Sequence, residues 1–292
     1  MNGITVIIIN YNGSGFAGRL IESLNNQTEP YSEIIIVDNA SSDNSDIEFL
    51  NGLSRIKYIY LEENTGFPHA VNIAVSQARQ QNILLLNNDI YLKDDFTENA
   101  LTAIKQYKRT IFAPLVMDYR GEYIDSAGDT VPSDLKPRKR LSGKKPYRMS
   151  AADVDSVSMS CCFFRKKDFL DAGSLNDYFF LYFEDVDFSM RAGMAGFNMR
   201  FMPHCIAYHY ISGSTKSVHG SSYSPLKVFY ETRNRVLLMR NLKTMALLRQ
   251  SAAIIAGTLA SAVFFASRGY SAEFISGLWT GIHDMKRVSY YD

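Results

Sequence analysis

The chain has 292 residues, 46% of them hydrophobic, which is enough for one large α/β domain or for a domain with an appended segment. Its 31 basic and 30 acidic residues nearly cancel, which argues against nucleic-acid binding. The three cysteines match neither a metal site nor a disulfide framework, and the N-terminus lacks the basic region of a signal peptide, so we expect a cytoplasmic protein.

The first ninety residues alternate between apolar runs and amphipathic stretches. The runs are short and uninterrupted, which is typical of parallel strands covered on both faces. Their alternation with helices and short loops predicts a doubly wound, mostly parallel sheet of the α/β class. The predicted strands span 5–9, 33–37, 56–61 and 83–86, and the predicted helices span 16–26, 41–53 and 68–80.

The pattern changes after about residue 116. Residues 118–150 are polar and rich in turn formers, with seven Lys or Arg between Lys136 and Arg148. We interpret them as a flexible basic insert, either solvated or acting as a flap toward an anionic ligand or a membrane. Strands over 154–165 and 201–210 and a helix over 184–195 follow. In that helix Asp187 and Arg191 have the i,i+4 spacing of an ion pair.

The chain is mostly helical from Ser224 onward. Residues 251–266 are nearly free of charge, but about sixteen residues are fewer than the ~20 of a membrane span. We therefore expect a buried helix or one lying against a membrane face. These features divide the chain into an α/β domain (1–222) and a C-terminal helical extension (223–292).

A glycine pattern in residues 13–18 has the form G-x-G-x-x-G and precedes a predicted helix, and Asp38 lies about twenty residues farther on. This pattern favours an NAD-type oxidoreductase. However, Asn10, Tyr11 and Asn12 separate the strand from the first glycine, whereas a dinucleotide site needs its tight turn directly at the strand end.

The predicted strand 83–86 ends on Asn87, Asn88 and Asp89. In open α/β sheets the carboxyl ends of the strands line the ligand crevice. A single carboxylate there can hold Mg²⁺ together with substrate phosphates. The alternative is a simple turn at the end of the strand.

Polar residues also follow the second and third strands. Asp38 and Asn39 could bind a nucleobase or a ribose, or could close an Asx turn. Asn64, Gly66 and Asn72 surround the start of a helix, where a phosphate is favoured, although a plain helix-start loop would have the same sequence.

A run of aromatic residues precedes Glu184, Asp185 and Asp187. Acids in a first helical turn can be mere dipole partners, but an acid beside an apolar wall can also become a general base. His209 ends the last predicted strand. It is either structural or, if near Asp89, a metal ligand through its neutral imidazole.

Together these motifs resemble the family 2 glycosyltransferases of the GT-A fold over residues 4 to about 215. The run Tyr230–Arg235 is similar to the rhamnosyltransferase-like branch, which often has a C-terminal helical extension. The matching segments are 6–13, 35–43, 64–67, 86–89, 125–128 and 179–187, together with Arg191, Gly196, Pro203 and His209.

The resemblance implies an inverting transfer from a UDP- or dTDP-sugar. It implies that Asp38 recognises the pyrimidine, that Asp89 and His209 hold Mg²⁺ or Mn²⁺, and that Asp185 is the catalytic base with Glu184 beside it. The residues expected around the donor are Asn10, Asn12, Asp38, Asn39, Asn64, Gly66, Asn72, Asn87 and Asn88.

The expected acceptor is a saccharide, in particular a lipid-linked glycan used for surface polysaccharide at the inner face of the cytoplasmic membrane. We also expect peripheral membrane contact, homo-oligomers and no nucleic-acid partner. The alternatives are a nucleotide-sugar-binding subunit without turnover, a nucleotidyltransferase and the NAD-type oxidoreductase.

Overall fold

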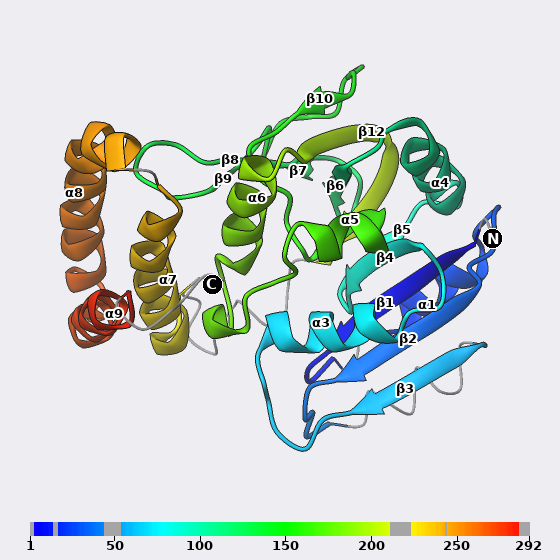
Figure 1. The fold of residues 1–292 in the computed structure, drawn as a ribbon. Helices are drawn as coiled ribbons and strands as arrows, with labels where there is room; N and C mark the ends of the chain where they lie inside the picture. The colour runs from blue at the N-terminus through cyan, green and yellow to red at the C-terminus, as the bar shows by residue number, and fades with distance from the viewer. Residues whose placement is uncertain (1–2, 14–16, 44–53, 211–222, 243, 286–292) are drawn as a thin grey trace.

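The structure is a computed structural model that describes residues 3–13, 17–43, 54–210, 223–242 and 244–285. The strands are β1 (Ile4–Asn10), β2 (Glu33–Asp38), β3 (Ile56–Tyr60), β4 (Asn82–Asn87), β5 (Ile90–Leu92), β6 (Thr110–Asp118), β7 (Ile124–Ser126), β8 (Asp129–Thr130), β9 (Arg138–Lys139), β10 (Ala152–Asp153), β11 (Cys161–Arg165) and β12 (Asn198–His209). The main sheet has the order β10-β12-β6-β11-β4-β1-β2-β3, with β5 paired to β12 and β7 to β6 (Figure 1). Strands β8 and β9 form a separate two-stranded sheet.

Helices cover both faces of the main sheet, and three more form the C-terminal extension (Figure 1). They are α1 (Ala17–Asn25), α3 (Phe67–Gln77), α4 (Phe96–Gln106), α5 (Lys166–Asp171), α6 (Glu184–Met194), α7 (Pro225–Leu238), α8 (Thr244–Ala266) and α9 (Ser271–Asp284). The strands predicted in the first ninety residues and the helices predicted over 16–26, 68–80 and 184–195 are therefore confirmed. The helix predicted over 41–53 lies almost wholly outside the described residues.

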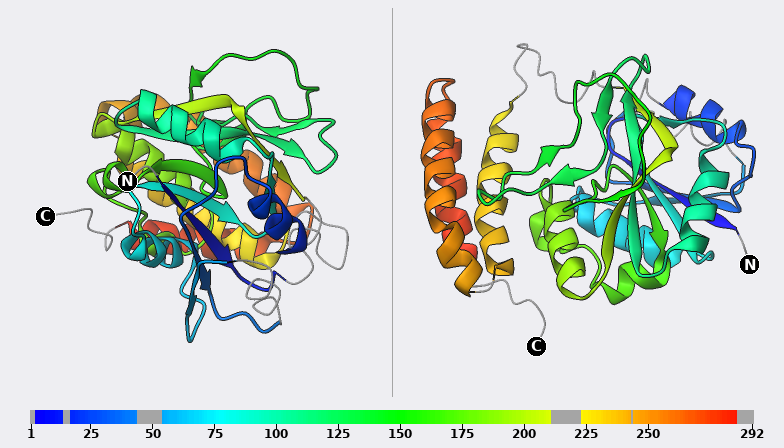
Figure 2. Two further views of the ribbon diagram at one scale, coloured as in Figure 1. Left: turned by 90° about the vertical axis from the view of Figure 1, so that its right-hand side faces the viewer. Right: turned by 90° about the horizontal axis from the view of Figure 1, so that it is seen from above.

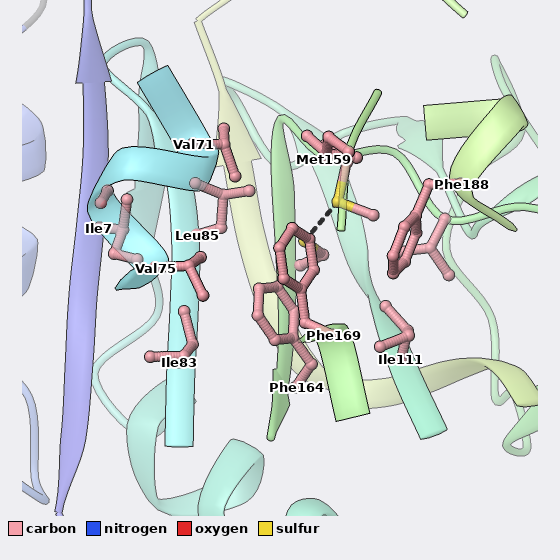
Figure 3. Close-up of a cluster of buried hydrophobic side chains, with 14 of the residues drawn as sticks. Ile7, Val71, Val75, Ile83, Leu85, Ile111, Met159, Phe164, Phe169 and Phe188 are labelled. Carbon is pink, nitrogen blue, oxygen red and sulfur yellow. Dashed lines mark hydrogen bonds between the residues drawn. The ribbon is translucent and has the colours of Figure 1, made fainter. Parts of the chain in front are cut away.

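Burial on both faces explains why the first strands read as unbroken apolar runs. Ile7 and Leu85 pack with α3, α5 and α6 on one face, in the cluster shown in Figure 3. Ile8 and Leu86 pack with α1 and α4 on the other face. Since successive strand residues point to opposite faces, both sets must be apolar.

The parallel register of β1 with β2 and β4 sets the position of the polar strand ends. Asn10 lies opposite Asp38, and Ile9 lies opposite Asn87. The first polar residues after three apolar runs therefore meet at one edge of the sheet.

The strand predicted over 154–165 is wrong in its first half. Only Cys161–Arg165 forms β11, antiparallel between β4 and β6. Val157 and Met159 are as buried as strand residues, although they lie in a loop. Their burial produces the same apolar pattern that a strand would give.

The basic segment 118–150 contains β7, β8 and β9. Leu141 and Met149 from this segment pack against Phe201 of β12. Strands β8 and β9 pair antiparallel, with Asp129 opposite Lys139.

The extension lies as a layer at one side of the sheet domain (Figure 2). Helix α7 contacts α6, and Leu237 and Ile254 pack with Phe179 and Phe183 of the aromatic run. Arg233 of α7 pairs with Asp284 of α9 at 3.0 Å. The extension is thus joined to the segment that leads into α6.

Helix α8 differs from the prediction in length and burial. It begins at Thr244, and the stretch Met245–Ala266 is long and apolar enough to cross a membrane by length and composition alone. Only 6% of its most apolar window is buried, so the buried-helix alternative is wrong, whereas a helix lying against a membrane face stays a prediction. The exposed large side chains of α8 are Met245, Leu248, Ile255, Leu259 and Val263, and those of α9 are Ile275, Trp279 and Ile282.

Candidate active site

Asp89 and His209 meet just beyond the end of β4, as the sequence predicted. The Nε2 atom of His209 lies 3.1 Å from Oδ2 of Asp89, and its Nδ1 atom lies 3.0 Å from Oδ2 of Asp125. Burial alone would lower the pKa of His209, but hydrogen bonds with Asp125 and Asp89 raise it to about 9. The ring is therefore held between two carboxylates, and Asp125 fixes its orientation.

Asp125 received no role from the sequence, although it belongs to a matching motif. Lys139 also donates to both of its carboxylate oxygens, at 2.9 and 2.8 Å. Burial would raise the pKa of Asp125, but the hydrogen bond from His209 and the charge of Lys139 lower it overall.

The pair Asp89 and His209 fits a divalent cation. Oδ1 of Asp89 is buried and has no hydrogen-bond partner in the described part of the chain. Carboxylate oxygen and imidazole nitrogen are both ligands for such a metal. Among the described residues, no cluster of three His, Cys, Asp or Glu forms a cage. A cation here would need phosphate oxygens to complete its shell.

The edge shared by β1, β2 and β4 carries a hydrogen-bonded row. Nδ2 of Asn10 donates to Asp38 at 2.7 Å, and Oδ1 of Asn10 accepts from Asn88 at 2.8 Å. Asp38 also accepts from the backbone N–H of Ser41, so the Asx turn is present. Asn12 lies beside this turn, where its Oδ1 accepts from the backbone N–H of Ser42.

Asn39 joins the β2 end to the loop before α3. Its Nδ2 donates to Oδ1 of Asn64 and to the backbone oxygen of Gly66. Gly66 has φ 87°, and a Cβ atom there would lie 2.6 Å from the backbone oxygen of Phe180. The close backbone approach at Gly66 is therefore to Phe180 of the aromatic run.

Asn72 is engaged with the segment before the aromatic run. Its Nδ2 donates to the backbone oxygen of Leu175 and to Asp177, and its Oδ1 accepts from the Leu175 N–H. The structure thus gives Asn72 a bracing contact and does not bring it to Asp89 or Asp185.

The aromatic run enters α6 through an unusual backbone. Phe180, Tyr182 and Phe183 all have positive φ, between 59° and 66°. A non-glycine residue held at positive φ costs about 1–3 kcal/mol. Asn234 of α7, fully buried, donates from Nδ2 toward the backbone oxygens of Phe179, Leu181 and Tyr182 at 2.9, 2.8 and 2.7 Å.

Glu184 and Asp185 begin α6 immediately after this strained run. Burial, and then the Asp185 charge, raise the pKa of Glu184, whose Oε2 has no hydrogen-bond partner in the described residues. Burial also raises the pKa of Asp185, but backbone N–H groups, including that of Val186 at 2.8 Å, counter it. Asp185 is therefore the stronger acid of the two and the better candidate for an ionised base.

Asp187 is structural. It is fully buried, and Arg191 donates to it at 2.8 Å, which confirms the predicted i,i+4 pair. Asn241 from the extension donates to its other oxygen at 2.9 Å.

A cavity of about 370 Å³ lies between the end of β4 and the start of α6, and its volume is within the usual range of ligand pockets, about 300–1,000 Å³. Asn87, from the end of β4, lines it together with Glu184 and Asp185. Sequence reasoning missed Asp129 and Glu231, which also line it. Glu231 lies in the run 230–235 that resembles the rhamnosyltransferase-like branch, and Asp129 directly follows the matching segment 125–128, but neither had received a role because both lie far from α6 in the sequence.

Comparisons with known proteins agree with this arrangement. A sequence model described as "Glycosyl transferase family 2" matches residues 5–172. The rhamnosyltransferase WbbL of Escherichia coli is 27% identical over 82% of this chain and 96% of its own length. An N-acetylglucosaminyl-diphospho-decaprenol L-rhamnosyltransferase of Mycobacterium tuberculosis is 22% identical over 73% of this chain and 77% of its own.

The fold is shared with solved glycosyltransferases. The crystal structure of GalNAc-T7 with UDP, GalNAc and Mn²⁺ superposes with a TM-score of 0.62 at 16% identity. The match covers 79% of this chain but only 47% of GalNAc-T7. This likeness identifies a GT-A-type sheet with helical additions.

Proposed function

The chain belongs to glycosyl transferase family 2, and we propose that it is an inverting, metal-assisted enzyme that transfers a sugar from a UDP- or dTDP-sugar to a glycan hydroxyl. It is a glycosyltransferase of polysaccharide biosynthesis and is similar to rhamnosyltransferases. Rhamnose is accordingly the first donor sugar to test.

One observation carries this proposal. The end of β4, next to Asp89, and the start of α6, with Asp185, open into the same cavity. A donor held by its nucleotide at the sheet edge would thus present its sugar to a carboxylate on the other side. Asp38, beside Asn10, would receive the pyrimidine, and the GalNAc-T7 complex with UDP and Mn²⁺ supports the choice of ligands.

Asp89 and His209 would hold Mg²⁺ or Mn²⁺, and a bound cation there neutralises charge on a nucleoside diphosphate. Asp185 removes the proton from the acceptor hydroxyl. The acceptor oxygen then forms a bond with the anomeric carbon as the bond from that carbon to the diphosphate breaks. A single displacement inverts the anomeric centre.

The acceptor that we favour is a lipid-linked glycan at the inner membrane face. The name of the Mycobacterium relative, which contains a diphospho-decaprenol, supports this choice. The exposed apolar side chains of α8, with the exposed Arg249 and Arg268 near its ends, suit an interfacial helix on anionic lipid. Sedimentation with anionic vesicles at low salt tests the contact, and failure to bind them would remove it.

The donor is tested by thermal shift with UDP- and dTDP-sugars, each with and without Mn²⁺, because a ligand of the native state raises the apparent stability. The base is tested with Asp185→Asn, which we expect to bind donor normally but to lower kcat at least 100-fold. Near-normal turnover of this variant would exclude Asp185 as the base.

The same assays address the alternatives. Donor binding without transfer or donor hydrolysis, across a broad acceptor panel, would indicate a non-catalytic subunit. Pyrophosphate release from a nucleoside triphosphate and a sugar phosphate would indicate a nucleotidyltransferase.

A further inference from the structure

The cavity between β4, β9, α6 and α7 is lined by four carboxylic acids, namely Asp129, Glu184, Asp185 and Glu231. Among its described lining residues Lys139 is the one cation, and Lys139 already forms hydrogen bonds with both carboxylate oxygens of Asp125. An anionic group inside the cavity would therefore find many acids and no uncommitted cation in the described lining.

Asp129 lines this cavity and is held there with one of its two carboxylate oxygens unpaired. It is 7% exposed, and its Oδ1 has no hydrogen-bond partner in the described part of the protein. Its backbone is fixed by the N–H to Ser156 oxygen hydrogen bond at 2.9 Å. An unpaired buried polar atom destabilises a fold, so a ligand hydroxyl would remove this cost.

Glu231 approaches from a different element, the first half of α7. Burial raises its pKa, and Lys227 lies 3.9 Å away, at the limit of an ion pair. Burial, and then the charge of Asp185, raise the pKa of Asp129 to about 7. Asp129 and Asp185 thus already oppose one another's ionisation, and another anion beside them would add to this repulsion.

The cavity lining also has an apolar and aromatic part. It is formed by Phe67, Leu181, Tyr182 and Phe183. A pyranose ring has apolar C–H faces and a rim of hydroxyl donors. An uncharged sugar thus matches both the aromatic wall and the carboxylates.

We propose that this cavity binds the acceptor's terminal sugar, that this sugar is uncharged, and that Asp129 and Glu231 bind its hydroxyls and reject acidic sugars. This inference rests on the proposed glycosyl transfer. Asp129 and Glu231 are specificity-determining residues, whereas Asp185 remains the base.

The direct test compares phenyl glycosides that differ only at C6, the neutral hexoside and the corresponding uronide, in the gluco, galacto and manno series. Affinities are measured by ligand-detected NMR with UDP and Mn²⁺ present. We expect at least one neutral glycoside to bind, and its uronide to bind at least tenfold more weakly. Equal or tighter binding of uronides, or binding of no neutral glycoside, would overturn the proposal.

Two conservative variants test whether Asp129 and Glu231 cause the discrimination against acidic sugars. Asp129→Asn and Glu231→Gln should each raise the KM of the acceptor about tenfold. Each should also reduce the ratio of the affinity for the neutral glycoside to the affinity for its uronide, and leave UDP binding unchanged. Asp153→Asn is the matched control. It makes the same change at an exposed aspartate that pairs with Arg200 and does not line the cavity. A change in donor affinity instead of acceptor KM would assign the cavity to the donor sugar and refute the proposal.

These measurements also distinguish failure of the proposed glycosyl transfer from failure of the acceptor assignment. If UDP-sugar fails to bind the wild-type protein at all, the proposed function fails. If donor binds and is transferred, but the acid sugars are accepted as readily as the neutral ones, only the acceptor assignment fails.

Discussion

Replacing Asn234 by alanine should disable the catalytic helix from a distance. Its Nδ2 lies within 2.9 Å of three backbone oxygens in the aromatic run, and Oδ1 accepts from Arg233. Alanine would remove this donor from all three carbonyls, and of these the Phe179 oxygen would still accept from the Leu181 N–H at 2.6 Å. The three left-handed residues, Phe180, Tyr182 and Phe183, would then have less to hold them in place.

The expected magnitude follows from the contacts. An amide has two hydrogens, so two full hydrogen bonds are lost, and each buried carbonyl left unsatisfied costs about 1–3 kcal/mol. We expect Asn234→Ala to lower the free energy of unfolding by about 3 kcal/mol. For a protein of this size that corresponds to a fall in Tm of roughly 6–12 °C.

The variant should lose more activity than its lower free energy of unfolding explains, because most of the protein would still be folded at the assay temperature. Relaxation of the run would move Asp185, while the hydrogen-bonded row of Asn10 and Asp38 lies on other elements. We expect kcat to fall about 100-fold, since small displacements of a catalytic group can cost that much. Nucleotide binding should persist.

The assay combines thermal unfolding, nucleotide titration and steady-state transfer on the same preparations. Asn99→Ala is the control, because it removes a single hydrogen bond to the His204 backbone at the surface. A variant Asn234→Ala with normal Tm and kcat would refute the role of Asn234 as the support of this run.

Three further predictions concern other parts of the site. Asp125→Asn should weaken Mn²⁺ affinity about 10–100-fold in a calorimetric titration with UDP present, because Asp125 orients His209; unchanged affinity would separate His209 from the metal. Gly66→Ala should lower Tm by several degrees, because φ is 87° and the new Cβ would meet Phe180; an unchanged Tm would contradict this steric reading. The free energy of unfolding of Asp129→Asn, relative to that of the wild type, should increase by about 2–3 kcal/mol as the pH rises from 5 to 8, measured by chemical denaturation. Burial and the Asp185 charge raise the pKa of Asp129 to about 7 against the opposing charge of Lys139, so the native state holds a proton that the unfolded chain has released, and the wild type loses stability as pH rises; a pH-independent difference would contradict the assignment.

The sequence predicted that the polar ends of the first strands lie together, because this information is local. Asn10, Asp38 and Asn87 each follow an apolar run, and a parallel sheet necessarily brings such ends to one edge. The i,i+4 pair of Asp187 and Arg191 was readable for the same reason.

The cavity at the start of α6 was less accessible to prediction because it depends on contacts between distant segments. Asp129 reaches the cavity through a two-stranded sheet in a segment that looks like a solvated loop. Asn234 lies about fifty residues beyond the carbonyls it binds. The run 230–235 marked the segment that contains Asn234, but periodicity and motif spacing do not say which distant residues it contacts.

The length of α8 was underestimated for a different reason. The polar residues Arg249, Gln250 and Ser251 interrupt the apolar run, although the helix continues through them to Thr244. Polar side chains do not interrupt the backbone hydrogen bonds of a helix. Composition therefore predicted the uncharged stretch 251–266 and not the full length of α8.

The support of the aromatic run by Asn234, together with the Arg233 to Asp284 pair, has a consequence for synthesis of the protein. Translation extends the chain from its N-terminus, and the about 145 residues between Asp89 and Asn234 take roughly 7–30 s at 5–20 residues per second. The strand ends that would receive the nucleotide are synthesised in the first third of the chain. The support of the aromatic run needs Asn234 of α7, and the Arg233 pair needs Asp284 of α9, the last described helix. Because His209 also precedes Asn234, we expect a growing chain to complete its nucleotide and metal residues before it can catalyse transfer, so that late ribosome-bound intermediates would bind nucleotide but be inactive.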